Sequence, residues 1–277
     1  HQLHRRQRQM CIRDRINNVV ERGDTPMKVI FNADDFGLTP GVNKGIVKAH
    51  QQGVVRSTTM MVGMDAEEHA VELAKQNPNL KIGVHLRFTT GSPLTGNPNL
   101  TNGQARFVSY DELWKKQDFE EEVVYQEAIA QVEAFLKLGL PLSHLDSHHH
   151  AHTHPQLLPV IRKVAQKYKV PLRGSGLCYI ENRVNYYFTD EFYDQGVSLE
   201  GIMKHLLSLK AQYDVVEVMC HPAEADQPLL LKSSYALQRE LELQVLTSSI
   251  FQQELTKHGM TVTDYSALIS PSKVASV

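Results

Sequence analysis

Short apolar runs alternate along this chain with longer amphipathic stretches, and this alternation restricts its fold more than any other feature. From Met27 onward the pattern predicts strands at 29–31, 54–62, 80–86, 142–145, 215–219 and 261–262. Between them it predicts helices at 40–52, 65–76, 119–138, 155–168 and 199–212, with one or two more across 235–258. Strands that alternate with helices of this length are typical of βαβ units, in which the strands run parallel. We therefore expect one α/β domain, a distorted or incomplete (β/α) barrel, with an open doubly wound sheet as the alternative.

Three local features complete this expectation. Asp65 stands where it can cap the helix at 65–76, with Glu68 in the capping-box position. Segments 87–110 and 173–197 are irregular and predict long loops. Residues 1–26 are rich in Arg and lack the apolar periodicity of the rest, so we expect a non-native or disordered leader before a domain at 27–277.

Composition excludes several classes of protein. The net charge is -2, from 29 basic and 31 acidic residues, which provides no basic field for nucleic acid or an anionic membrane. No apolar run approaches the roughly 18 residues of a membrane span. Three Cys without CxxC spacing do not make a disulfide framework, so we expect a reducing, cytoplasmic location.

Polar side chains gather at four points where predicted strands end. Asp34 and Asp35 follow the first strand, His85 ends the third, and His221 follows the strand at 215–219. The segment 144–154, after the strand at 142–145, holds six His and one Asp. In parallel α/β folds the carboxyl ends of the strands meet at one edge, where the active site lies. We therefore interpret the four clusters as one converging site.

The residue types at this edge indicate metal-assisted hydrolysis. Imidazole and carboxylate ligands together suit Zn, Mn, Co, Ni or Fe, whereas oxygen-only sites suit Mg. Two His and one carboxylate leave positions open for water and substrate, as catalytic sites require. A second Asp, not bound to the ion, would take a proton from water, and a His opposite it would protonate the leaving group. The sequence lacks GxGxxG, GxxxxGK[ST] and GxSxG, which argues against a phosphate cradle and a serine hydrolase.

Four motifs in this order resemble the YdjC-like carbohydrate deacetylases, most closely the chitooligosaccharide (chitobiose) deacetylase branch. They are NADDFGLTPGVNKGI, GVHL followed by GSPL, HLDSHHHAHTHPQ and EVMCHPA, and the resemblance covers about residues 27–264. It implies a distorted (β/α) barrel that removes N-acetyl groups from short N-acetylglucosamine oligosaccharides, phosphorylated or not. Acetate and a free amine would be the products, in a step of chitin breakdown.

The resemblance also implies roles for individual residues. It places one divalent ion on Asp35, His85 and His148: magnesium by the resemblance, or Zn, Mn, Co or Ni by the ligand types. It leaves Asp34 free as the general base. His221 is the candidate acid.

Substrate contacts are a separate set of expectations. His150 and His152 are candidates both for substrate contact and for the role of the acid. Arg173 would meet an anionic group or a sugar hydroxyl, with a surface salt bridge as the alternative. Aromatic residues at 179–193 would stack on sugar rings or anchor the loop. We expect a small oligosaccharide as the partner, no nucleic acid and no membrane, with a homodimer left open.

Two alternatives compete with the deacetylase. A metal-dependent phosphoesterase or amidohydrolase on a similar barrel would want a second ion, which Glu217 or Asp146 would help to hold. A sugar-binding protein that has lost turnover is the alternative from another class, but it would have no need of a free base beside Asp35.

Overall fold

The central strand of the fold is β1 (Met27–Phe36). We describe residues 26–176 and 184–269 of a computed structural model. Every residue of β1 except Lys28 is buried. Strands buried on both faces, with near-continuous apolar sequence, are typical of parallel sheets covered by helices.

The strands form one parallel sheet, which within the described residues has seven members in the order β4-β3-β2-β1-β6-β5, with β7 also paired to β1. The remaining strands are β2 (Ser57–Met60), β3 (Lys81–Leu86), β4 (Leu142–Ser147), β5 (Tyr186–Thr189), β6 (Val215–Cys220) and β7 (Met260–Thr263). β6 pairs with residues 28–33 of β1, whereas β7 pairs with 27–30 and β2 with 32–36. Because β6 takes one edge of β1, β7 and β2 share the other edge at different heights.

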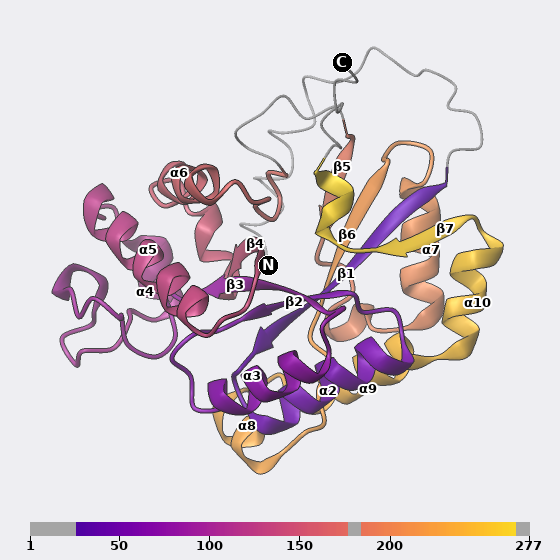
Figure 1. Cartoon of the computed structure of the whole chain (residues 1–277), viewed down its shortest axis with the longest axis horizontal. Helices are drawn as coiled ribbons and strands as arrows, with labels where there is room; N and C mark the ends of the chain where they lie inside the picture. Colours follow the sequence, from indigo (N-terminus) through magenta and orange to yellow (C-terminus); the bar gives the residue numbers. More distant parts are fainter. Residues whose placement is uncertain (1–25, 177–183, 270–277) are drawn as a thin grey trace.

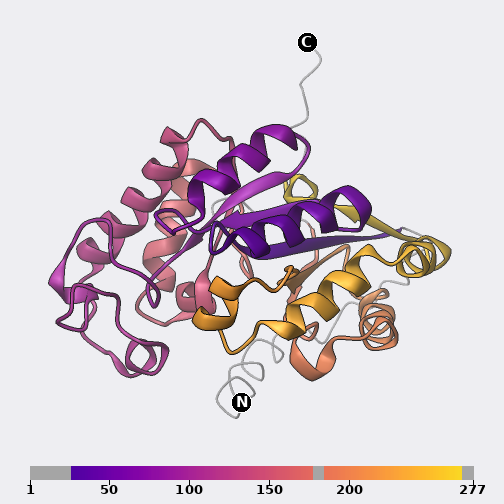
Figure 2. The same ribbon diagram turned by 90° about the horizontal axis from the view of Figure 1, so that it is seen from below.

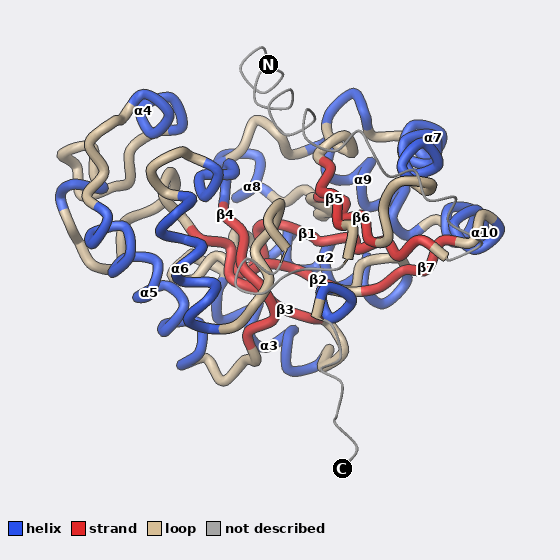
Figure 3. The backbone as a smooth tube through the Cα atoms, turned by 90° about the horizontal axis from the view of Figure 1, so that it is seen from above, coloured by secondary structure: helices blue, strands red, loops and turns tan. Residues whose placement is uncertain are grey.

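The sheet curls into a half-barrel, since its end strands β4 and β5 do not pair with each other in the described part of the chain. This confirms the prediction of an incomplete (β/α) barrel in a single α/β domain. Helices surround the curled sheet (Figures 1 and 3), and α2 packs between α3 and α9 on its underside (Figure 2). The helices are α2 (Pro40–Gln52), α3 (Glu67–Gln76), α4 (Tyr110–Lys115), α5 (Glu121–Lys137), α6 (Leu158–Tyr168), α7 (Leu199–Leu209), α8 (Gln227–Lys232), α9 (Leu237–Thr247) and α10 (Ser249–Lys257). None of those described is long and apolar enough to cross a membrane.

Local signals account for most of the boundaries. The stretch 235–258 forms two helices because Ser248 ends α9 and its side chain accepts a hydrogen bond from the Phe251 amide at the start of α10. The capping box at Asp65 was wrong: Ala66 is the N-cap of α3, without a side-chain hydrogen bond, and Asp65 instead forms an ion pair with Lys232.

Three elements lie where the sequence predicted only loops or left a gap. They are α4, β5 and α8. The start of α4 carries a complete capping box between Ser109 and Glu112, a signal that the sequence offered. β5 lies at the end of the sheet, and its sequence, YYFT, shows no alternation of apolar and polar residues.

Strand register brings the polar clusters together. His85 of β3 lies beside Asp146 of β4, and Ala33 of β1 lies beside Cys220 of β6. Asp34, His85, the residues after β4 and His221 therefore reach the same edge of the sheet.

Candidate active site

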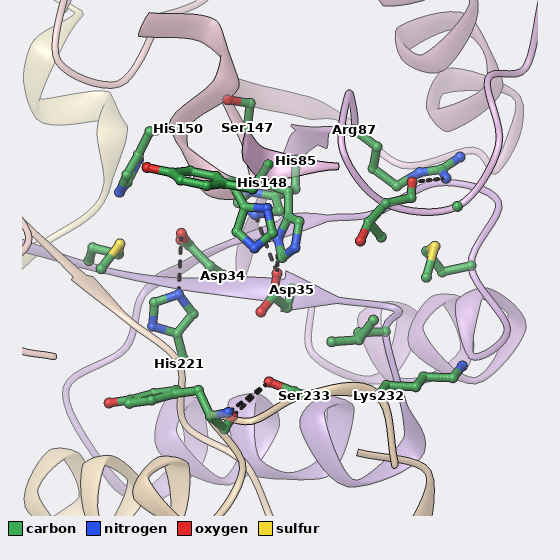
Figure 4. A pocket seen from close by; sticks show the side chains of 18 of the residues that line it. Asp34, Asp35, His85, Arg87, Ser147, His148, His150, His221, Lys232 and Ser233 are labelled. Atoms are coloured by element: carbon green, nitrogen blue, oxygen red, sulfur yellow. Dashed lines mark hydrogen bonds and ion pairs between the residues drawn. The ribbon is translucent and has the colours of Figure 1, made fainter. Parts of the chain in front are cut away.

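A pocket of about 1600 Å³ opens at the carboxyl edge of the sheet. Its volume exceeds the roughly 300–1,000 Å³ typical of small-ligand sites, which is room enough for more than one sugar ring. Figure 4 shows Asp34 and Asp35 at its floor, with His148 on one side and His221 facing them from the other. Four of the predicted strand ends thus contribute to one cavity.

The three expected metal ligands come together. Asp35 Oδ1 lies 3.0 Å from His148 Nδ1 and 3.4 Å from His85 Nε2. One ligand atom from each residue lies within 4.8 Å of the others, close enough to hold one metal ion. The donor set therefore fits one divalent ion, as predicted; imidazole and carboxylate together suit Zn, Mn, Co, Ni or Fe better than the magnesium that the resemblance implies.

His85 is held from behind by a second carboxylate. Its Nδ1 lies 2.6 Å from Asp146 Oδ1, and Thr59 Oγ1 donates to Asp146 Oδ2 at 3.0 Å. Because an ionised carboxylate only accepts hydrogen bonds, Nδ1 carries the proton and Nε2 is directed to Asp35. This carboxylate–histidine pairing is the usual support of a metal ligand. Burial alone would lower the pKa of His85, but in the metal-free protein Asp146 and Asp35 raise it to about 10.

Asp34 lies outside this triad, yet it is not free of partners as predicted. Arg173 donates to both of its carboxylate oxygens, at 2.6 and 2.7 Å. Burial alone would raise the pKa of Asp34, but the charge and hydrogen bonds of Arg173 hold it well below its usual value. His221 Nε2 lies 3.9 Å from Asp34 Oδ2, across the pocket floor. Asp34 is therefore an anion throughout the physiological range and a weak base.

Arg173 differs from both readings of the sequence, substrate contact and surface salt bridge. It is 1% exposed and does not line the pocket. Besides Asp34, its guanidinium binds Asp146 at 2.9 Å and Glu217 at 2.6 Å. One cation thus joins three buried carboxylates, and two of them, Asp146 and Glu217, are the residues that would have helped to hold a second metal ion.

His221 is positioned by Glu242, which lies in the middle of α9. Its backbone amide donates to the buried Glu242 carboxylate, whose other oxygen accepts from the Tyr235 hydroxyl at 2.6 Å. Its Nδ1 lies 3.8 Å from the same carboxylate. His221 Nε2 consequently faces Asp34 from the opposite side of the pocket, the position expected of a proton donor.

The six histidines of 144–154 do not act as one group. His144 Nε2 contacts Asn32 Oδ1 at 3.0 Å, and its ring stacks on Tyr265 outside the pocket. His152 is buried, and its Nδ1 lies 2.6 Å from Ser147 Oγ, so it stabilises the turn after β4 instead of contacting substrate as expected. His150 does line the pocket, where burial and nearby Arg173 lower its pKa to about 4.

The aromatic residues of 179–193 also have different surroundings. Tyr193 lines the pocket and is 40% exposed, with Tyr235 stacked on one face of its ring. Phe192 is core, and the Tyr186 hydroxyl donates to Glu217. Tyr179 lies outside the described residues.

Two residues that the sequence reasoning missed belong to the site: Arg239, which binds Asp35, and Glu242. Both lie in α9, where they look like ordinary charges of a surface helix. Their burial, 4% and 0% exposed, is the feature that distinguishes them, and only the fold reveals it.

Known proteins share this fold and sequence. A curated carbohydrate deacetylase from Vibrio campbellii is 77% identical over 251 residues, which are 91% of this chain and 100% of its own length. One from Brevibacillus brevis is 41% identical over 251 residues, covering 87% of this chain and all of its own. A crystal structure of an Enterococcus faecalis protein named for cellobiose-phosphate cleavage superposes with a TM-score of 0.80 at 33% identity, over 88% of this chain and 99% of that one.

The comparison with protein families gives the same assignment. Residues 28–257 match the family described as YdjC-like protein, a span that includes Asp34, Asp35, His85, His148 and His221. Together with the identity to the curated relatives, this shows that the chain belongs to the YdjC-like family.

Proposed function

We propose that the protein is a metal-dependent carbohydrate deacetylase that removes N-acetyl groups from short N-acetylglucosamine oligosaccharides. The observation that carries this proposal is the triad of Asp35, His85 and His148, with Asp34 beside it and His221 opposite. The name of the curated relatives, carbohydrate deacetylase, supports the same reaction.

The residues of the site suggest how the amide would be hydrolysed. Asp35, His85 and His148 would hold a divalent ion, which would polarise the carbonyl oxygen of the substrate and acidify water. Asp34 accepts the proton of the attacking water; its low pKa makes it a weak base, so it depends on that acidification. His221 Nε2 donates a proton to the departing nitrogen as the C–N bond breaks, which yields acetate and the sugar amine. Arg173 holds Asp34 in place throughout.

The pocket supports an oligosaccharide substrate. It is lined by the exposed ring of Tyr193 and by polar side chains, the combination that sugar rings and hydroxyls require. Arg87, Arg106 and Lys232 also line it, which supports a phosphorylated sugar as one form of the substrate. The name of the Enterococcus faecalis protein, with its sugar phosphate, points the same way.

Acetate release decides between this function and its alternatives. Metal-loaded protein should release acetate from diacetylchitobiose, lose the activity with a chelator and regain it with a divalent ion; phosphorylated and unphosphorylated sugar compared side by side give the preferred form. Release of phosphate without acetate would favour a phosphoesterase. Binding without either product would favour a sugar-binding protein. Arg173 pairs with Asp146 and Glu217, the residues that a second ion would need, which argues against a two-metal phosphoesterase. Asp34 and His221 face each other as a base and an acid would, which argues against a protein that only binds sugar.

Four further proposals concern the ion, the location, the N-terminal segment and the assembly. We infer magnesium as one candidate ion from the family resemblance, and a cytoplasmic location from the three cysteines without CxxC spacing. We place residues 1–26 outside the functional domain, and we propose a homodimer as the assembly to test. Activity with each ion, fractionation of the cells, activity after deletion of residues 1–26, and sedimentation of the purified chain test these in turn.

A further inference from the structure

The ion pair between Arg239 and Asp35 has no role in the reaction described above. Arg239 Nη2 lies 2.7 Å from Asp35 Oδ2, across 204 positions of sequence, and both side chains are almost fully buried. Burying two charges in this way is weak evidence for a gain in stability, because desolvation offsets the attraction. Stability therefore does not explain the ion pair between Arg239 and Asp35, which points to a functional role.

The two oxygens of Asp35 have separate partners. Oδ1 faces His85 and His148, which are the other two candidate ligands, whereas Oδ2 faces only Arg239 among the contacts that define the site. Asp35 also has a φ of 73°, a left-handed conformation that a residue with a side chain rarely adopts and that persists only where the surrounding structure holds it.

Arg239 is itself fixed and cannot swing away from Asp35. Its Nε donates to the Tyr235 backbone carbonyl at 2.8 Å, one turn earlier, and its guanidinium lies 5.8 Å from the centre of the Tyr235 ring. Its Nη1 is buried without a hydrogen-bond partner in the described part of the structure. A buried donor left unpaired is destabilising, so the guanidinium keeps its contact with Asp35 although its Nη1 goes unpaired.

We propose that Arg239 is a positioning residue that restricts Asp35 to one-oxygen binding of the divalent ion. A carboxylate can bind a metal ion through one oxygen or both. With Oδ2 held by Arg239, only Oδ1 is presented, and the position that a second oxygen would take stays open for water and substrate. The positive charge of Arg239 also weakens the attraction between Asp35 and the ion. The arrangement therefore lowers the affinity for the ion but keeps a coordination position open. The inference rests on the proposed metal dependence.

The test compares R239M with the parent protein and with R56M. Arg56 is a matched control, since it is half-buried and its Nη1 donates to three backbone carbonyls far from Asp35. Metal-depleted proteins are titrated with Co²⁺, and affinity, visible absorption and acetate release are measured. Absorption by Co²⁺ weakens as its coordination number rises, so it reports the number of bound ligands independently of turnover.

We expect R239M to bind one Co²⁺ at least as tightly as the parent, with weaker absorption and a kcat at least tenfold lower, whereas R56M matches the parent. R239K keeps the positive charge but not the planar guanidinium, so its spectrum and kcat should lie between those of R239M and the parent. If R239M does not fold, R239K is measured in its place. An unchanged spectrum or kcat in a folded R239M or R239K would overturn the inference, as would a loss of Co²⁺ affinity above tenfold. If the parent itself binds no Co²⁺, the proposed metal dependence fails instead.

Discussion

Replacing each of the two adjacent aspartates by asparagine should separate metal binding from proton transfer. Asp35→Asn removes the charge that lies between His148, His85 and Arg239, so the ion should be lost together with activity. Asp34→Asn removes no member of the triad, so the ion should stay. We expect its kcat to fall by about 10²–10⁴-fold, the usual contribution of a general base.

The structure gives the stability cost of Asp34→Asn. The variant keeps one side-chain oxygen for Arg173 and loses one of two charge-assisted hydrogen bonds. Arg173 retains Asp146 at 2.9 Å and Glu217 at 2.6 Å, so no buried cation is left unpaired. The free energy of unfolding should therefore fall by about 1–3 kcal/mol, less than the 3–5 kcal/mol of a broken buried pair. The activation barrier should rise by about 3–5 kcal/mol, at 1.36 kcal/mol per tenfold of rate.

The assay measures bound metal by elemental analysis, acetate release at saturating ion, and unfolding in urea. Asp118→Asn is the matched control, because Asp118 is exposed, pairs only with Lys116 among the described contacts, and lies outside the pocket. An empty Asp34→Asn beside a loaded Asp35→Asn would reverse the two roles. Near-normal turnover in a loaded Asp34→Asn would place the base elsewhere, with His150 next because it lines the pocket.

Three further outcomes follow from the site. Burial lowers the pKa of His85, but Asp146 and Asp35 outweigh it and raise this pKa to about 10 in the metal-free protein, so a bound ion must displace the proton of His85. The affinity for the ion should therefore rise about tenfold per pH unit between pH 7 and 9, and calorimetry in buffers of different ionisation heat should show one proton released. His221→Ala should keep the ion and lower kcat by about 10²-fold or more, measured as acetate release, and an unchanged kcat would assign the acid to another group. Burial raises the pKa of Asp34, but Arg173 outweighs it, so this pKa is lower in the folded chain than its usual 3.8. The ionised Asp34 therefore stabilises the fold above about pH 4, and this contribution is lost as the pH falls further. Urea unfolding from pH 5 to 2 should show a steeper loss of unfolding free energy in the parent than in Asp34→Asn.

The sequence could predict the half-barrel and the convergence of the polar clusters because both depend on short-range patterns, whereas the choice of Asp35, His85 and His148 as ligands came from the family resemblance. Apolar strands alternating with amphipathic helices specify parallel pairing, and parallel pairing brings His85 and His148 to the edge where Asp35 stands. The strand at 186–189 escaped prediction because its sequence, YYFT, shows no alternation of apolar and polar residues and lies within an irregular stretch.

Side-chain direction was the part that the sequence could not provide. Within 144–154, spacing alone does not say which imidazoles turn to the pocket, since the chain leaves the strand at Ser147 and both His149 and His150 adopt positive φ. Of this set, His148 reaches Asp35, whereas His152 turns to Ser147. Tertiary contacts that form only after folding decide between these directions.

The different roles of Asp34 and Asp35 depend on two arginines remote in sequence. Two adjacent buried carboxylates would ordinarily repel, and the pKa of one would rise until they shared a proton. Here the turn at Asp35 sends the carboxylates apart, Asp34 to Arg173 at a separation of 139 residues and Asp35 to Arg239 at 204. Each carboxylate stays ionised beside its own cation, so the pair can hold an ion and accept a proton at once instead of exchanging one proton between them. A motif of two neighbouring aspartates therefore identifies the site, but the residues that make the two different come from the segment after α6 and from α9.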